Sequence, residues 1–173
     1  MQALAFWKAV TVDRSNLLER FFELFRAHHV RFCLIGGQAV NAYVEPVVSL
    51  DLDVVVAADQ LPEAEAMLAT AFNVERFPHS LNVSVPASDV RVQVQLDPRY
   101  AAFVERAIPR EVLGLTLPVA ALDDVLCGKV WAVQNSTRRG SKRHKDLADI
   151  ARLLESYPQF RPAVPADVLA RLI

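Results

Sequence analysis

The chain has 173 residues, of which 53% are hydrophobic and 23% are charged, and its formal net charge is −1. These values are typical of one globular domain with a substantial core, and they exclude a global field that would draw the protein to nucleic acid or a membrane. Two cysteines make no disulfide framework, and we expect neither a signal peptide nor a membrane span, hence a cytoplasmic protein.

In chain order, the sequence predicts helices and strands in alternation. The first helix runs from a cap at Ser15 to about His28, with leucines and phenylalanines on one face at helical spacing. Periodicity and proline or glycine breaks predict the remaining elements: a strand at 32–35, a short helix at 38–43, a strand at 51–56, a helix from 59 or 60, strands at 73–77, 81–85 and 90–96, a helix at 99–107, a hairpin at 110–118, and helices at 119–134, 142–156 and 166–173.

This order predicts an α/β (or α+β) fold in a single domain. We expect a small mixed sheet with helices packed on one face in a core of residues 1–118, and a C-terminal helical region of residues 119–173 that closes over a ligand.

The stretch from residue 32 to residue 53 carries the clearest chemical signal. An apolar run ends at Gly36-Gly37, whose backbone N–H groups open a short helix and form a concavity suited to phosphate. Asp51 and Asp53 begin the next strand and point to the same face, because side chains alternate along a strand. Adjacent carboxylates repel each other unless a cation lies between them, and oxygen-only ligands favour Mg²⁺ or Mn²⁺. The combination indicates metal-dependent phosphoryl or nucleotidyl transfer.

A polar face is also predicted on the strand at 90–96. Its residues alternate strictly, with Val90, Val92, Val94 and Leu96 on one side and Arg91, Gln93, Gln95 and Asp97 on the other. Asp97 is the candidate for a third carboxylate beside the Asp51–Asp53 pair. It is equally a helix cap, because Asp97-Pro98 comes directly before the helix at 99–107, and Gln95 would then take the third position.

The strand, the glycine pair, the short helix and the run Ser49-Leu50-Asp51-Leu52-Asp53 together resemble the DNA polymerase β-like nucleotidyltransferase superfamily. Small bacterial members such as the AbiEii-type toxins of abortive-infection systems are the most similar, and the later Lys-Asp-Leu-Ala-Asp run at 145–149 fits the same group. The resemblance implies Mg²⁺-dependent (or Mn²⁺-dependent) transfer of a nucleoside monophosphate from an NTP to an acceptor hydroxyl. It also implies RNA, including tRNA, as an acceptor, and a cognate antitoxin as a partner.

The resemblance assigns the carboxylates to metal binding and catalysis. Asp51, Asp53 and Asp97 would hold the metal, and Asp97 would help to deprotonate the acceptor. Ser49 matches a Ser/Thr position in the family and either hydrogen-bonds a phosphate or caps the strand.

The nucleotide-binding role falls on glycines and lysines. Gly36 and Gly37 would cradle the triphosphate, while Lys129 and Lys145 would neutralise it. A basic cluster, defined here as Arg138, Arg139, Lys142, Arg143 and Lys145, opens a helix where the macrodipole prefers acids. This placement indicates a polyanionic partner, either the triphosphate or an RNA acceptor.

Each of these sequence features also has a simpler, purely structural explanation. Two acids at a strand end can be solvated, a glycine pair can be an ordinary tight turn, and a basic run can be surface, with Lys145 and Asp149 as an i,i+4 helix pair. The chain also departs from the family, because Val47 stands where many members carry arginine and the glycine pair lacks a serine. Two alternative functions therefore remain: a catalytically retired nucleotide- or RNA-binding module, and a transferase for a small aminoglycoside-like molecule.

Overall fold

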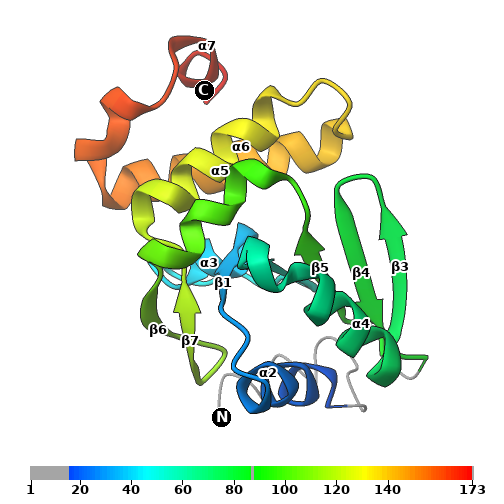
Figure 1. The fold of residues 1–173 in the computed structure, drawn as a ribbon. Helices are drawn as coiled ribbons and strands as arrows, with labels where there is room; N and C mark the ends of the chain where they lie inside the picture. Colours follow the sequence, from blue (N-terminus) through cyan, green and yellow to red (C-terminus); the bar gives the residue numbers. More distant parts are fainter. Residues whose placement is uncertain (1–15, 87, 173) are drawn as a thin grey trace.

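The computed structural model describes residues 16–86 and 88–172, which form one seven-stranded mixed sheet flanked by helices (Figure 1). The strands are β1 (Phe32–Ile35), β2 (Asp51–Val56), β3 (Asn73–Phe77), β4 (Ser80–Ser84), β5 (Arg91–Gln95), β6 (Ile108–Val112) and β7 (Leu115–Val119). They lie in the order β3-β4-β5-β2-β1-β7-β6; β2 pairs with β5 and β1 with β7 in parallel, and the other pairs are antiparallel. The predicted mixed α/β fold is confirmed.

The helices follow the sequence pattern closely. They are α2 (Leu17–Ala27), α3 (Gly36–Asn41), α4 (Leu61–Ala71), α5 (Leu122–Gln134), α6 (Gly140–Ser156) and α7 (Ala166–Leu169), with 3₁₀ turns η1 (Ala58–Gln60), η2 (Pro98–Arg106) and η3 (Pro158–Ala163). The cap predicted at Ser15 lies outside the described residues; α2 begins after Asn16, whose φ is 55°. The segment at 98–106, predicted as an ordinary helix, is a 3₁₀ helix.

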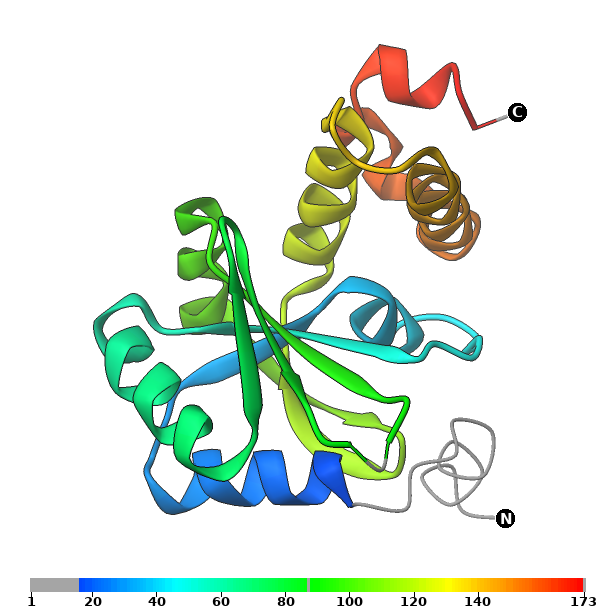
Figure 2. The same ribbon diagram turned by 90° about the vertical axis from the view of Figure 1, so that its right-hand side faces the viewer.

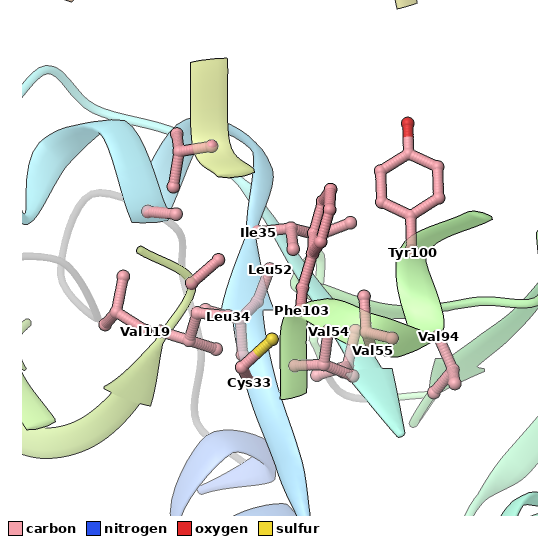
Figure 3. Packing of buried hydrophobic residues seen from close by; sticks show 14 of the residues in the cluster. Cys33, Leu34, Ile35, Leu52, Val54, Val55, Val94, Tyr100, Phe103 and Val119 are labelled. Atoms are coloured by element: carbon pink, nitrogen blue, oxygen red, sulfur yellow. The ribbon is translucent and has the colours of Figure 1, made fainter. Parts of the chain in front are cut away.

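One face of the sheet is dry and packs against α2 and α4. Val92 and Val94 of β5 and Leu81 and Val83 of β4 are fully buried on this side. Phe32 of β1 stacks on Phe22 of α2, with ring centroids 5.5 Å apart. Figure 3 shows Val54 of β2 beside Val94 of β5, which are paired in register. This apolar layer is the part of the hydrophobic core that holds the strands of the sheet in place.

The C-terminal helices stand over the opposite side of the sheet. Helices α5 and α6 pack against each other and rise above the strands in Figure 2. Phe103 of η2 stacks on Trp131 of α5, with centroids 5.7 Å apart. From α6, Arg152 donates to the carbonyl of Glu45, and beyond it Tyr157 donates to the carbonyl of Tyr43. The helical region therefore clamps the segment that joins α3 to β2.

Within the described residues there is neither a disulfide nor a helix suited to cross a membrane. The cysteines, Cys33 and Cys127, are both free thiols, and burial raises the pKa of Cys33 to about 12. None of the helices within residues 16–86 and 88–172 is long and apolar enough to span a bilayer.

Candidate active site

Asp51 and Asp53 lie together at the start of β2 and line a cavity of about 130 Å³ between the sheet and the C-terminal helices. Leu52 between them is fully buried on the dry face, as strand alternation requires. Burial raises the pKa of Asp53 from 3.8 to about 6, and the neighbouring charge of Asp51 adds to this effect, while Lys129 opposes it. A carboxylate destabilised in this way gains strongly from a bound cation.

Gly36, the first residue of α3, makes the closest approach to this pair. Its φ is +70°, and a Cβ built on it would lie 2.3 Å from Oδ2 of Asp53. Any side chain at position 36 would therefore displace the carboxylate. A Cβ on Gly37 would make only ordinary contacts with Ser49, 3.6 Å from its Oγ and 3.9 Å from its Cβ. Both glycines line the cavity, but only Gly36 is required by the protein's own packing.

Ser49 is 5% exposed and also borders the cavity. Its Oγ donates to the backbone carbonyl of Asp51 at 3.3 Å, and its own carbonyl accepts from Nε2 of buried Gln38 at 3.3 Å. These bonds fix the backbone just before the carboxylate pair. The strand-capping interpretation of Ser49 thus has a structural counterpart.

The third position is occupied by amides. Gln93 pairs with Asp53 across β2 and β5, and both Gln93 and Gln95 line the cavity. Asp97 does not line it: the carboxylate accepts from the backbone N–H of Arg99 at 3.0 Å and forms an ion pair with its guanidinium at 2.9 Å. Asp97 therefore takes the capping role that its sequence position also allowed, and the side-chain hydrogen bond from Arg99 lowers its pKa.

Lys129 lies at the cavity wall inside a network of ion pairs. It is 7% exposed, and its Nζ lies 3.0 Å from Oδ1 of Asp146 and 2.8 Å from Oδ2 of Asp149. Arg138 binds the same Asp146, and Arg152 binds the same Asp149. Burial disfavours the lysine's charge, but the two aspartates outweigh it and raise the pKa of Lys129. Lys129 is thus charged, and its Nζ already forms ion pairs with two aspartates. The family resemblance implied instead that this lysine neutralises the triphosphate.

The basic cluster is divided by the structure. Arg138, Lys142 and Lys145 line the cavity, whereas Arg139 and Arg143 do not. Within the described part of the chain, no acidic group lies at ion-pair distance from Lys142 or Lys145. The expected Lys145–Asp149 helix pair is absent there, because Asp149 faces Lys129 and Arg152 instead. Lys142 and Lys145 are the cations available to a ligand.

Several residues at the cavity were not predicted as site residues, among them Gln93, Tyr100 and Asp124. Gln93 had been placed only on the polar face of its strand, and Tyr100 and Asp124 had not been singled out at all. Asp124, in the first turn of α5, forms a bidentate pair with Arg106 at 2.8 and 2.9 Å. An acid in the first turn of a helix is so common that it gave no signal for a site.

The donor set fits a hard divalent cation at Asp51 and Asp53, with ligand oxygens completing its shell. No group of three His, Cys, Asp or Glu side chains suited to a metal occurs within residues 16–86 and 88–172. Among the described residues that line the cavity, Asp51 and Asp53 are thus the carboxylates that are not ion-paired, with the amides of Gln93 and Gln95 beside them.

Comparison with known proteins agrees with this geometry. A family model described as nucleotidyl transferase AbiEii toxin, Type IV TA system, matches residues 17–172. A search of curated proteins found no match.

Several solved structures share the fold. ANT(2'')-Ia in complex with adenylyl-2''-tobramycin has a TM-score of 0.64 at 11% identity, covering 91% of this chain and 98% of that one. Lincomycin-bound LnuA, a lincosamide antibiotic adenylyltransferase, has a TM-score of 0.54 at 13% identity, covering 80% of this chain and 97% of that one. At such low identity, these similarities establish the fold alone.

Proposed function

The chain belongs to the AbiEii family of nucleotidyl transferase toxins and is a nucleotidyltransferase, and from this premise we propose that it moves a nucleoside monophosphate from an NTP to a hydroxyl of a polynucleotide acceptor. The proposal includes a divalent cation, Mg²⁺ or Mn²⁺, held by Asp51 and Asp53.

The observation that carries the proposal is the charge arrangement of one cavity. Asp51 and Asp53 line its sheet side, while Lys142 and Lys145 approach from the start of α6. A cation relieves the repulsion between adjacent carboxylates, and lysines that face a cavity without an acidic partner attract an anion. A metal-bound triphosphate satisfies both requirements at once.

The roles of the chain's own residues follow from their positions. Asp51 and Asp53 would orient the metal-bound triphosphate, and the backbone at Gly36-Gly37 would face its phosphates. A bound divalent ion supplies charge neutralisation at the phosphoryl group. Lys142 and Lys145 would neutralise the remaining phosphate charge, whereas Lys129 would hold α5 and α6 together at the cavity wall.

The balance of charge favours a polyanionic acceptor over a cationic one. Beyond Asp51 and Asp53, the acids lining the cavity are Asp124 and Asp146, and both are already paired with basic side chains. A cationic antibiotic, like the tobramycin adduct bound to ANT(2'')-Ia, would find no unpaired acid except the metal ligands. We therefore favour RNA as the acceptor. A toxin role and a cognate antitoxin as partner follow the family description.

The experiment that tests this proposal is calorimetric titration with each NTP, with and without Mg²⁺. We expect metal-dependent binding to the wild type and its loss in Asp51→Asn/Asp53→Asn. Asp89→Asn is the matched control, because Asp89 is exposed and does not border the cavity. Thermal melts of all variants verify folding. Failure of the folded wild type to bind any NTP would refute the proposal.

Asp97→Asn separates the two interpretations of Asp97. The structure places its carboxylate on Arg99, so the variant should keep metal-dependent NTP binding. Loss of that binding in a folded Asp97→Asn protein would return Asp97 to the metal site.

A further inference from the structure

A second hollow lies on the polar face of the sheet next to the cavity, since Arg91, which borders the hollow, pairs in register with Asp51. It has a volume of about 340 Å³ and is bordered by Asn73, Val74, Glu75, Asn82, Ser84 and Arg91. Its size is at the lower end of the range for small-molecule sites, about 300–1,000 Å³. Apart from Val74, every bordering side chain is polar or charged.

Strand register connects this hollow directly to the catalytic carboxylates. Asp53 pairs with Gln93, Gln93 with Asn82, and Asn82 with Glu75, so these four side chains form one row across β2, β5, β4 and β3. Directly paired residues share a face, and neighbouring strands are about 4.8 Å apart. The row therefore extends about 14 Å from the carboxylate pair along a continuous polar surface.

The opposite face of the same three strands is packed against the rest of the protein. Leu81, Val83 and Val92 are completely buried there, and Arg76 reaches Glu65 of α4 on that side. The polar face is different: Arg91 and Glu75 are exposed on it. Figure 1 shows the β3–β4 hairpin projecting beyond the C-terminal helices.

Two details indicate that the hollow accommodates a ligand. Oδ1 of Asn82 is shielded from solvent and has no hydrogen-bond partner among the described residues. A donor from a ligand, or a rotation of the amide toward one, would satisfy it. Phe77, which pairs with Ser80 on the same face, leaves 40% of its surface exposed at the end of β3.

We propose that this hollow, with Phe77 beside it, binds the single-stranded polynucleotide acceptor upstream of its reacting end. Arg91 contacts a phosphate, Asn82 and Glu75 accept hydrogen bonds from a base edge, and Phe77 provides a stacking surface. The reacting hydroxyl then lies toward Asp51 and Asp53, one strand from Arg91 and three strands from Glu75. This inference rests on the proposed function, since it concerns the acceptor of the same reaction.

The chemistry of the hollow favours a nucleotide over a cationic sugar. Its bordering residues carry one acid, Glu75, and one base, Arg91, so net charge alone does not decide between the two. The guanidinium and the exposed ring match the phosphate and base of a flexible strand.

The test uses Arg91→Gln with Arg76→Gln as its matched control. Both remove one positive charge from the same three-stranded region, but Arg76 lies on the opposite face, bound to Glu65. Fluorescence anisotropy with labelled ten-nucleotide RNA and DNA strands of the same sequence measures binding to the full chain. We expect Arg91→Gln to weaken binding about 3–10-fold and to lower the salt dependence, d log K/d log[salt], by about 0.7. Arg76→Gln should change neither.

Phe77→Ala provides a second, uncharged arm and should weaken binding by about 5–10-fold or more through lost stacking. Preference for the RNA or the DNA strand identifies the source of the acceptor. Equal losses in Arg91→Gln and Arg76→Gln, no loss in either, or no strand binding by the wild type would overturn the inference.

Calorimetry with Mg²⁺ and NTP on the Phe77→Ala protein separates the two proposals. Phe77 does not line the cavity, and it lies on β3, three strands from β2 in the sheet, so NTP binding should stay unchanged. Arg91 is unsuitable for this comparison because it pairs in register with Asp51. Strand binding without any NTP binding would refute the proposed function, whereas NTP binding without strand binding would refute only this inference.

Discussion

Gly36 is the residue on which the geometry of the carboxylate pair depends most directly. Its positive φ and the 2.3 Å approach of a built Cβ to Oδ2 of Asp53 leave no room for alanine. We predict that Gly36→Ala lowers the free energy of unfolding by about 1–3 kcal/mol, because the left-handed backbone and the contact are both strained. Chemical denaturation measures this loss.

Gly37→Ala is the control for that prediction, since its Cβ would make only an ordinary contact with Ser49. We expect its unfolding free energy to stay near that of the wild type. Equal losses in the two variants would show that general helix disruption, and not the approach to Asp53, is responsible.

Asp53 is predicted to reduce the stability of the metal-free protein. Its pKa is raised from 3.8 to about 6 by burial, so the folded state binds a proton that the unfolded state releases between those pH values. The stability contributed by the protonated group is complete below about pH 4 and is lost as pH rises through about 6. Asp53→Asn, which stays neutral, should therefore be more stable than the wild type above pH 6, by about 1–3 kcal/mol.

Thermal melts of both proteins in chelator from pH 4 to pH 8 test this sign. The difference in Tm should be near zero at pH 4 and reach its maximum above pH 6. A constant difference across the range would mean that the Asn side chain acts by packing and not by titration.

Gln93 occupies the position at which a third carboxylate would complete the metal site. We therefore predict that Gln93→Asp increases the affinity for a divalent cation. An additional negative charge beside Asp53 should tighten Mn²⁺ binding by roughly tenfold, equivalent to about 1.4 kcal/mol. Electron paramagnetic resonance titration of Mn²⁺ measures the change. Gln95→Asp is the control. Gln95 lies two residues further along β5 and pairs with Val55, so the gain in Mn²⁺ affinity should be smaller. Equal affinity in Gln93→Asp and wild type would show that position 93 does not face the ion.

At the scale of elements, the ion pairs between α5 and α6 explain how a buried lysine is tolerated. Lys129 forms ion pairs with Asp146 and Asp149. Asp146 is also paired with Arg138, and Asp149 with Arg152. Removing one partner of a buried network leaves uncompensated charge, which typically costs about 3–5 kcal/mol.

We therefore predict that Lys129→Met lowers the free energy of unfolding by about 3 kcal/mol, at the low end of that range because both aspartates retain a partner. Lys142→Gln, an exposed change without an ion pair to lose, should alter stability by less than about 0.5 kcal/mol but weaken NTP binding. Urea unfolding and calorimetry distinguish the two lysines. If Lys129→Met kept full stability and lost only NTP binding, Lys129 would be a phosphate ligand as the family resemblance implied.

The sequence predicted elements better than it predicted their partners. Strict alternation in 90–97 identified both the dry and the polar face of β5, because alternation is a local property of a strand. Register is not local: the parallel pairing that puts Gln93 beside Asp53 depends on a strand some forty residues earlier. Asp97 was for this reason left between two roles, and only the structure shows it bound to Arg99.

The same limit applies to the basic cluster. Its position at the start of a helix drew attention to Lys145, which lines the cavity. The sequence did not show that Arg138 and Lys142 also reach the cavity, whereas Arg139 and Arg143 do not. Nor could it show that Lys129 meets Asp146 and Asp149, because those contacts join two helices whose packing is decided by their apolar faces.

At the scale of the whole molecule, the cavity is built from two parts of the chain. Its sheet side comes from β2 and β5, and its other side comes from α5 and α6. The clamp formed by Arg152 and Tyr157 on residues 43–45 is a direct link between these parts. A ligand that touches both sides should add to this link.

We predict that Mg²⁺ with the preferred NTP raises the Tm of the whole chain in a single transition. At a ligand concentration of about 100 times Kd, mass action stabilises the folded state by about 2.7 kcal/mol, which corresponds to a rise of roughly 5–10 °C for a domain of this size. Differential scanning calorimetry measures the shift, and Asp51→Asn/Asp53→Asn is the control that should show none. Since the ligand contacts both parts, they should unfold together; a ligand that sharpened or shifted only one of two separate transitions would instead place the NTP on one part alone and contradict the bridging role of Lys142 and Lys145.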